Sequence, residues 1–278
     1  YACHLGGVLS DEMGLGKTLE SIAFLSLVKE KSPILVVAPK SVLYNWNSEY
    51  ARFDPEREVL VLPTLQKERE EAILGIENDK SKVILTSYDS LRNDVELYKG
   101  KRFSVLLLDE AQSIANAFAK KSLAVKEIDA SARFALTGTP IQNSLLDLWS
   151  IFDFILPGYF PPYAEFKATF GSNEFASEEK KRFLEKSISP FLLRRTKKEV
   201  LLDLPKREES NFFLTLSESQ RSVYEEYLLK ARGELAKEEN GDGDKISVLA
   251  AITRLRQICV DPGLFLDGYQ GDAVKIAY

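Results

Sequence analysis

The sequence predicts an α/β fold in which a mostly parallel sheet is flanked by helices and followed by helical protrusions. Three observations support this prediction. Short apolar runs alternate with helical stretches in the first half of the chain, a glycine-rich segment with a lysine follows the first run, and proline-punctuated helical sequence takes over after about residue 156. Alternating strands and helices are typical of parallel sheets with right-handed crossovers.

The predicted strands are continuously apolar, which indicates burial on both faces of the sheet. They lie at residues 8–10, 34–38, 59–62, 83–85, 105–108 and 134–136. The first crossover helix is predicted to begin near Lys17, and further helices are predicted at 42–53 and 66–76. The residues of the first helix expected to face the sheet are Leu19, Ile22, Ala23 and Leu27.

The second half of the chain is predicted to be mostly helical, with one further buried strand at 211–216. Ser217 followed by Gln220 matches a capping box at the start of a long helix. A second amphipathic helix is predicted between a break at 240–244 and the stop signal at 261–263.

Composition argues against several classes of protein. With 45% hydrophobic and 28% charged residues and no apolar run near the roughly 18 to 20 residues of a bilayer span, we expect a globular protein with no membrane role. A net charge of −5 argues against a uniformly basic nucleic-acid coat, so any DNA contact is expected to be a local patch. Cys3 and Cys259 lack the spacing of a zinc site or a disulfide framework and indicate a reducing compartment. Since the chain opens without methionine, we expect it to be part of a longer protein.

The segment Gly-Leu-Gly-Lys-Thr follows the first predicted strand and has the composition of a phosphate-binding loop. Gly14 and Gly16 would let a phosphate approach backbone N–H groups at a helix N-terminus. Lys17 would reach the β- and γ-phosphates, and the Thr18 hydroxyl would ligate Mg²⁺. The general pattern requires a glycine where this chain has Asp11, so an ordinary glycine-rich turn stays an alternative on these residues alone.

An acidic pair follows another predicted strand. The apolar run at 105–108 would deliver the carboxylate of Asp109 to the edge of the sheet, within reach of Mg²⁺. Glu110 comes next and could orient and deprotonate an attacking water. The alternative for each residue is a solvated acidic strand end, but the glycine-lysine-threonine segment upstream in the same strand-helix pattern favours the functional interpretation.

With these residues in place, the chain resembles the SWI/SNF-type ATPases of helicase superfamily two, in their bacterial branch. DEMGLGKT at 11–18 matches the first motif of that family, including the aspartate that breaks the general spacing. Further segments similar to the family's motifs are LVVAPKSVLYNWNSEYARF at 35–53, TSYDSLRND at 86–94, LLLDEAQ at 106–112, ALTGTPIQNSLLDLWSIFDFILPGYF at 135–160, FLLRRTKKEV at 191–200 and RLRQICVDPGLF at 254–265.

The resemblance implies an ATP-dependent translocase on double-stranded DNA, with ATP and Mg²⁺ as cofactors and two RecA-like lobes. Residues 1–156 would form the core of the ATP-binding lobe, 157–210 a helical protrusion that returns to that lobe, and 211–278 the helical start of the second lobe. The rest of the second lobe, with the arginine finger that completes the ATP site, and the upstream segment that reads adenine would lie outside this sequence. A finger arginine contributes on the order of 10³ to 10⁵ in turnover, so the isolated chain is expected to be nearly inactive.

The resemblance also assigns site residues. Lys17, Asp109 and Glu110 are the expected catalytic residues, with Thr18 and Asp109 at the metal. The expected nucleotide contacts are Met13, Gly14, Leu15, Gly16, Lys17, Thr18 and Leu19. The expected DNA contacts are Lys40, Ser41, Thr86, Ser87, Arg194 and Arg195. The residues expected to couple the phosphate site to the DNA face are Thr137, Thr139 and Gln142.

Several alternatives stay open on the sequence alone. Trp46 is interpreted as a core aromatic, and the basic cluster around Arg194 could be no more than a solvated surface. A nucleotide-gated scaffold that clamps DNA or a protein, and a strand-separating helicase, are the other functional hypotheses. A DNA-bound protein such as RNA polymerase is a further candidate partner. Gln112 in the acidic box favours a bacterial protein of the cytoplasmic nucleoid, whereas a eukaryotic origin would place it in the nucleus.

Overall fold

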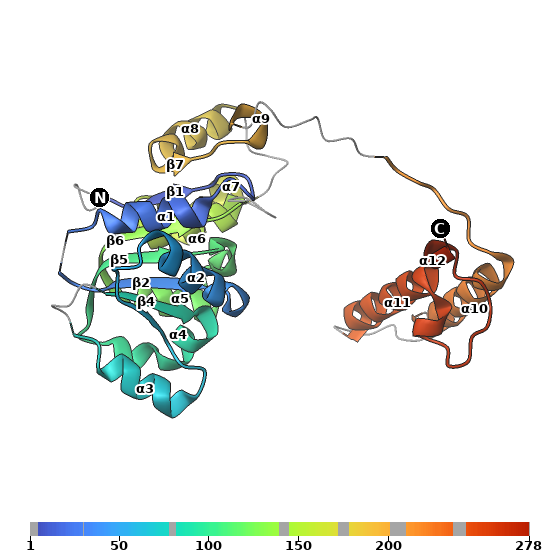
Figure 1. The fold of residues 1–278 in the computed structure, drawn as a ribbon. Coiled ribbons are helices and arrows are strands. Elements are labelled where there is room, and N and C mark those ends of the chain that lie inside the picture. Colours follow the sequence, from blue (N-terminus) through green and yellow to red (C-terminus); the bar gives the residue numbers. More distant parts are fainter. Residues whose placement is uncertain are drawn as a thin grey trace. The chain divides into compact units, whose positions relative to one another are not determined.

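The computed structural model describes residues 5–29, 31–77, 82–138, 145–171, 178–200, 210–235 and 243–277. The chain forms two compact units, Tyr1–Leu204 and Pro205–Tyr278, each described by itself below (Figure 1). The predicted boundary at 156/157 falls inside unit 1, and the predicted boundary at 210/211 falls shortly after the start of unit 2. The three-part division into lobe, protrusion and second lobe therefore stays a prediction.

Unit 1 is built on a seven-stranded sheet with the order β3-β4-β2-β5-β6-β1-β7, in which every recorded pairing is parallel. The strands are β1 Gly7–Leu9, β2 Ile34–Ala38, β3 Val59–Val61, β4 Val83–Ser87, β5 Arg102–Leu108, β6 Asp129–Leu136 and β7 Leu192–Leu193. The six strands predicted for the first half are confirmed. The two-residue β7 was not predicted, because its sequence is too short to carry a strand pattern.

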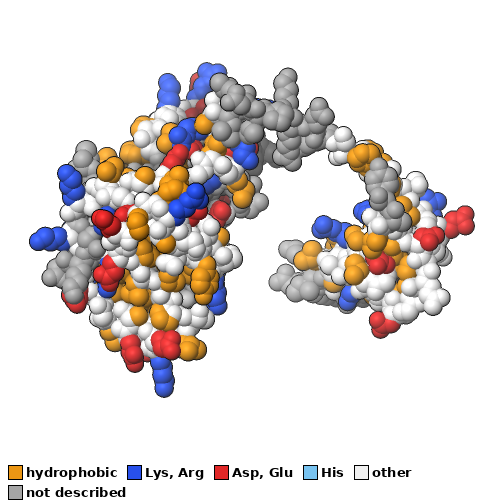
Figure 2. Space-filling model, in the orientation of Figure 1, with side chains coloured by type: hydrophobic (Ala, Val, Ile, Leu, Met, Phe, Trp, Pro, Cys, Tyr) orange, Lys and Arg blue, Asp and Glu red, His pale blue; other side chains and the backbone are white. Residues whose placement is uncertain are grey.

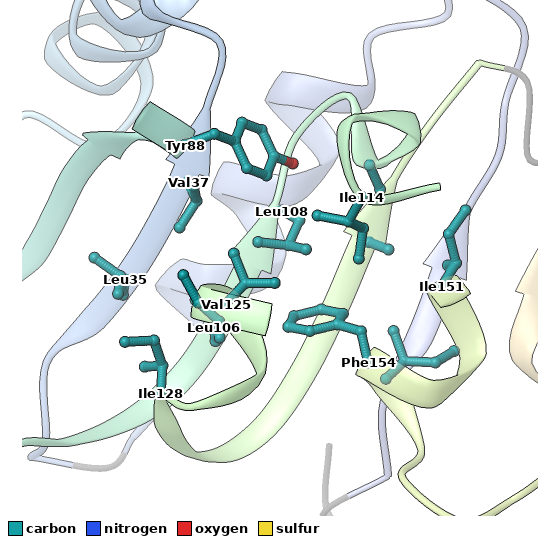
Figure 3. Packing of buried hydrophobic residues seen from close by; sticks show 14 of the residues in the cluster. Leu35, Val37, Tyr88, Leu106, Leu108, Ile114, Val125, Ile128, Ile151 and Phe154 are labelled. Atoms are coloured by element: carbon teal, nitrogen blue, oxygen red, sulfur yellow. The ribbon is translucent and has the colours of Figure 1, made fainter. Parts of the chain in front are cut away.

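Side chains of the central strands alternate between two apolar clusters, one on each face of the sheet. Leu35, Leu106 and Leu108 belong to one cluster, which also contains Tyr88, Ile114 and Phe154 (Figure 3). Ile34, Val36, Val105 and Leu107 point to the opposite face and pack with residues of α1 and α2. This double burial is the physical reason for the continuous apolar strands.

Helices connect the strands and cover both faces of the sheet (Figure 1). In unit 1 they are α1 Lys17–Ser26, α2 Leu43–Phe53, α3 Gln66–Leu74, α4 Tyr88–Asp94, α5 Lys120–Lys126, α6 Leu145–Ile155, α7 Tyr163–Phe170, α8 Glu178–Ile188 and α9 Lys197–Val200. Short 3₁₀ turns are η1 Lys40–Val42, η2 Val95–Tyr98, η3 Ala111–Ile114 and η4 Ser189–Phe191. The helices predicted to begin near Lys17 and at 42–53 and 66–76 are thus confirmed within two residues at each end.

Two local expectations were wrong. The buried stripe of α1 contains Ser21, Ile22 and Leu25, so the prediction holds for Ile22, whereas Leu19, Ala23 and Leu27 are exposed. The helix is therefore rotated about its axis by roughly one residue, or about 100°, from the predicted phase.

The second error is the buried strand expected at 211–216. Within the described residues this segment has no strand assignment, and Phe213 is 94% exposed. A strand needs a neighbouring strand to satisfy its backbone groups, and unit 2 contains only helical elements among its described residues.

Unit 2 consists of α10 Glu218–Leu235, α11 Gly243–Val260, η5 Pro262–Leu264 and α12 Val274–Ala277. Half of the predicted capping box is present at the start of α10, since the Gln220 amide donates to Ser217 Oγ at 3.2 Å, while the Gln220 side chain bonds to residues other than Ser217. The buried Gln220 side chain also accepts from the Val274 amide at 3.1 Å, which ties α12 to α10. Residues 240–242 of the predicted break lie outside the described residues, whereas Gly243 and Asp244, predicted to belong to the break, already form the first turn of α11.

Among the described residues, none of the helices combines the length and the apolar character that crossing a bilayer requires.

Adjacent residues of α3 provide a test of the core. Ile73 is fully buried in the apolar cluster that contains Leu35 and Leu106, whereas Leu74 is 64% exposed. We expect Ile73→Ala to lower the free energy of unfolding by about 2–5 kcal/mol, because it removes buried methyl groups and leaves a cavity. Leu74→Ala is the matched control, expected to change it by less than about 0.5 kcal/mol. Urea titrations of both variants measure the difference, and equal losses would contradict the placement of α3.

Candidate functional site

The three motifs singled out in the sequence follow three strands that are neighbours in the sheet. The phosphate-loop segment follows β1, Asp109 and Glu110 follow β5, and Thr137 follows β6, while the strand order runs β5-β6-β1. Because all three strands are parallel, their carboxyl ends meet at one edge. A Cβ atom built on Gly138 would lie 3.9 Å from Lys17 Nζ, so the segment after β6 borders the lysine directly.

The segment between β1 and α1 has the backbone of an open, anion-accepting loop. Gly14 and Gly16 have φ values of +87° and +85°, a region that side chains with a Cβ rarely adopt. Gly16 precedes the first residue of α1 and supplies no side-chain cap, so the first N–H groups of the helix face outward. A helix N-terminus with uncapped N–H groups favours a bound anion.

Lys17 begins α1, and its amine donates to the backbone carbonyl of Asp11 at 2.8 Å. In the described part of the chain no carboxylate forms an ion pair with this amine. Of the other predicted nucleotide contacts, Leu15 and Thr18 are half-buried, while Met13 and Leu19 are exposed. The loop therefore presents a cation and backbone donors together, as a phosphate requires.

Asp109 is held in place by contacts from α2, from α4 and from the residue that follows it. Its Oδ2 accepts from Trp46 Nε1 of α2 at 2.8 Å, and its Oδ1 accepts from the Glu110 amide at 2.9 Å. Its carbonyl accepts from the Tyr88 hydroxyl of α4 at 2.7 Å. The orientation of this carboxylate is thus set by α2 and by the Glu110 amide, while α4 holds the backbone carbonyl.

Burial raises the pKa of the Asp109 carboxyl above its ordinary value, while the Trp46 hydrogen bond and the positive charge of Lys17 oppose that rise. The same surroundings raise the pKa of the buried Tyr88 hydroxyl, first through desolvation and then through the charges of Asp109 and Glu110. The influence of Lys17 on Asp109 agrees with the convergence of the two motifs at one edge of the sheet.

Glu110 has a left-handed backbone with φ +50°, the only non-glycine residue with positive φ among the described residues. Its carboxylate accepts from Gln112 Nε2 at 2.7 Å, and Gln112 Oε1 accepts from Thr137 Oγ1 at 3.0 Å. A strained backbone is typical of positions whose side chain must point in one direction. The polar chain from Glu110 to Thr137 therefore links the acidic pair to the segment after β6.

The other two predicted coupling residues, Thr139 and Gln142, lie outside the described residues. Thr137 is itself buried, and its amide donates to the Leu9 carbonyl of β1 at 3.1 Å.

The predicted DNA contacts fall into two groups. Lys40 and Ser41 are exposed directly after β2, and Arg194 is exposed after β7. On the face that Figure 2 shows, basic side chains are interspersed with acidic and apolar ones. The described part of this face therefore has no continuous basic surface, and any DNA contact on it would be local, as expected for a chain with a net negative charge.

Three other predicted DNA contacts have surroundings that the sequence did not indicate, and their role stays a prediction. Thr86 Oγ1 is inaccessible to solvent, so it is not available to a phosphate in this conformation. Ser87 is also buried and uses its Oγ as the cap of α4, accepting from the Ser90 amide at 3.1 Å. Arg195 is bound by the carboxylates of Asp11 and Glu20, with which a DNA phosphate would have to compete.

Sequence reasoning missed the residues that hold the site together. Trp46 is a fully buried core residue, as interpreted, but it also donates to Asp109. Gln112 and Tyr88 likewise contact the acidic pair through hydrogen bonds. The sequence does hold one signal for such a contact: a tryptophan predicted to be buried, such as Trp46, usually needs a hydrogen-bond acceptor for its indole N–H.

The residues present fit an Mg²⁺ ion bound together with a nucleotide. No cluster of three or more metal-ligating side chains occurs among the described residues. Mg²⁺ at nucleotide sites needs only one or two protein ligands, because phosphate oxygens and waters supply the rest. One carboxylate, Asp109, and one hydroxyl, Thr18, are sufficient for that role.

Comparisons with known proteins agree with this geometry. Residues 1–264 match the family described as the SNF2-related domain. An uncharacterized ATP-dependent helicase of Mycoplasma genitalium is 37% identical over 258 residues, which is 91% of this chain and 24% of the relative. Helicase ssl-1 of Caenorhabditis elegans is 36% identical over 95% of this chain and 12% of the relative.

A solved structure, the Sulfolobus solfataricus SWI2/SNF2 ATPase core in complex with dsDNA, is similar with a TM-score of 0.66 and 36% identity. That match covers 97% of this chain and 57% of the other. The fold of unit 1 is thus a RecA-like α/β fold. The chain spans about a quarter of the Mycoplasma relative.

The Trp46–Asp109 hydrogen bond can be tested by stability. Trp46→Phe keeps an aromatic ring in the core but removes the donor, and we expect a loss of about 1.5–3 kcal/mol in the free energy of unfolding. Tyr44→Phe is the matched control on the same helix, because Tyr44 is 80% exposed. Denaturant unfolding at neutral pH measures both variants, and a Trp46→Phe protein as stable as the control would contradict this contact.

Proposed function

The chain belongs to the SNF2-related family, and on that premise we propose that it carries the ATP-binding part of a DNA-dependent ATPase that moves along double-stranded DNA. The observation that carries the proposal is the meeting of three motifs at the carboxyl ends of β5, β6 and β1. Asp109 and Thr137 directly follow β5 and β6, and Lys17, which is distant from them in the sequence, begins the helix after β1.

In this proposal each residue at the carboxyl ends of these strands has its own role. The loop at 14–16 and Lys17 bind the phosphates, while Thr18 and Asp109 hold Mg²⁺. ATP with its metal supplies the phosphoanhydride bond whose hydrolysis drives the motor. Glu110 orients a water and accepts its proton, which requires a carboxylate close to the γ-phosphate.

The chain of hydrogen bonds from Glu110 through Gln112 to Thr137 supports a coupling role for Thr137. A change at the γ-phosphate would alter the partners of Glu110, and each bond in the chain would respond. Hydroxyl and amide groups at strand ends can exchange partners in this way without unfolding the elements that carry them. Thr139 and Gln142 stay proposed members of the same segment.

DNA binding is proposed to use phosphate contacts from Lys40, Ser41 and Arg194. A motor that moves along any sequence cannot rely on strong base readout, so backbone contacts are sufficient. The similar Sulfolobus protein is an ATPase core in complex with dsDNA, which favours duplex DNA as the track. A DNA-bound protein such as RNA polymerase is a proposed target of the moving complex.

Two other functions are alternatives to translocation. A strand-separating helicase is favoured by the names of the relatives, which call them helicases, and a strand-displacement assay separates unwinding from translocation. A nucleotide-gated scaffold would bind DNA or protein with little turnover. The chain spans 57% of the Sulfolobus ATPase core, so we also propose that it hydrolyses ATP slowly when separated from a second lobe.

Substitutions at Lys17 and Glu110 should have different consequences. Lys17→Ala is expected to weaken ATP binding at least about tenfold, because it removes a charge-assisted contact to phosphate. Glu110→Gln should retain ATP binding but lower DNA-stimulated phosphate release by about 10² to 10⁴ in the intact motor. Titration with a fluorescent ATP analogue and a phosphate-release assay measure the two effects.

Glu71→Gln is the control for Glu110→Gln, since Glu71 is an exposed glutamate of α3 outside the site. A Glu110→Gln protein that keeps its biological function without turnover would support the scaffold instead of the enzyme.

The proposed DNA face predicts a change in salt dependence. If Lys40 contacts a phosphate, Lys40→Ala should lower the slope of log affinity against log salt by about one unit. Lys31 is an exposed lysine that precedes β2, at the opposite edge of the sheet, and Lys31→Ala should leave the slope unchanged. Duplex binding at several salt concentrations measures both slopes, and identical slopes in the two variants would remove Lys40 from the DNA face.

A further inference from the structure

The segment after the helical protrusion runs along the phosphate loop. β7 pairs in parallel with β1, with Leu192 opposite Val8 and Leu193 opposite Leu9 (Figure 1). The backbone contact continues past the strands, because the Ser10 amide donates to the Leu193 carbonyl at 2.7 Å and the Glu12 amide donates to the Arg195 carbonyl at 3.0 Å. Residues 192–195 therefore border the start of the loop.

Arg195 makes most of its polar contacts with that loop. Its amide donates to Asp11 Oδ1 at 2.8 Å, and its Nε donates to Asp11 Oδ2 at 2.8 Å. Its Nη2 forms further ion pairs with Asp11 and with Glu20 of α1, the latter at 2.6 Å. These contacts raise the pKa of the Arg195 guanidinium above its ordinary value. A planar guanidinium is the cation that can serve two carboxylates in this way.

The carboxylate that Arg195 holds is fully buried, and the same residue contacts the catalytic lysine. Asp11 has no exposed surface, and its backbone carbonyl accepts from Lys17 Nζ at 2.8 Å. A buried carboxylate needs both a counter-charge and hydrogen-bond donors, and Arg195 supplies them. The residue whose side chain pairs with Arg195 therefore also accepts from the Lys17 amine through its backbone carbonyl.

Lys197 adds a second contact between the same two segments. Its amide donates to Glu12 Oε2 at 2.8 Å. A Cβ atom on Gly14 would lie 3.4 Å from its amine, so this side chain borders the middle of the loop. The loop is thus supported at its first two residues and at Gly14 by one continuous segment.

We propose that Arg195 is a positioning residue of the nucleotide site instead of a DNA contact. It fixes Asp11, and through Asp11 and Glu20 it holds the phosphate loop and the start of α1 in the conformation that accepts phosphate. This inference rests on the proposed function, since it concerns the same ATP site. It also gives a physical role to the aspartate that stands where the general phosphate-loop pattern has glycine, because a glycine would offer Arg195 no carboxylate.

Nucleotide binding and loop protection test this inference in the full chain. Arg195→Ala should raise the dissociation constant for a fluorescent ATP analogue by about ten- to a hundredfold, by analogy with the loss of contacts that orient metal ligands. Amide hydrogen exchange at residues 12–18 should become faster in the nucleotide-free protein. Arg182→Ala is the matched control, because Arg182 is an exposed arginine of α8 in the same unit.

Arg195→Lys distinguishes positioning from general stability. The lysine keeps the counter-charge of Asp11 but lacks the planar fork, so we expect a melting temperature near that of the wild type and an intermediate loss of nucleotide affinity. The salt slope of duplex binding should not change, because no phosphate contact is lost.

Three outcomes would overturn the inference. Wild-type nucleotide affinity in both Arg195 variants, or unchanged exchange at residues 12–18, would show that the loop does not depend on Arg195. A lowered salt slope would return Arg195 to the DNA face. If Lys17→Ala also kept wild-type nucleotide affinity, the proposed ATP site itself would be wrong. If Lys17→Ala lost affinity while both Arg195 variants kept it, only the positioning role of Arg195 would be rejected.

Discussion

The adjacency of β5, β6 and β1 is the constraint on which the site depends. β1 is far from β5 and β6 in the sequence, yet it pairs with β6 in the sheet, and parallel pairing brings the carboxyl ends of all three strands to one edge. The side chains that follow them meet because the strands are fixed by burial on both faces. A shift of one residue in the β5–β6 register would move Asp109 relative to Thr137 by about 3.3 Å and turn the side chains of the shifted strand to the other face.

The sheet was predictable from sequence because its strands carry a strong, simple signal. Continuous apolar runs such as 34–38 and 105–108 have few alternative structures in a chain with intervening helices. The phosphate loop was predictable for a different reason, since Gly14 and Gly16 occupy backbone conformations that few other residues adopt. Both signals are local, and both survive in a single sequence.

Other features were not predictable because they depend on tertiary contacts. The phase of α1 was wrong because several apolar stripes fit its sequence, and only packing on the sheet selects Ser21, Ile22 and Leu25. The sequence around Thr86 does not indicate that its side chain is buried. It is buried because Thr86 lies on β4, which has strands on both sides in the sheet. Likewise Arg195 lies in a basic run that suggests a surface, and the carboxylates that bind it come from residues 11 and 20.

The polar contacts around the site explain why so many of its residues lie on loops and yet are held in one orientation. Asp109 receives hydrogen bonds from α2 and from its own following residue, and Glu110 is fixed by Gln112 despite a left-handed backbone. The strain at Glu110 persists because the surrounding contacts determine its position. A site held in this way needs little rearrangement to receive a charged ligand, since donors and charges are already oriented before binding. The rigidity of the sheet edge and the openness of the glycine loop are therefore complementary: the first fixes the carboxylates, and the second leaves room for phosphate.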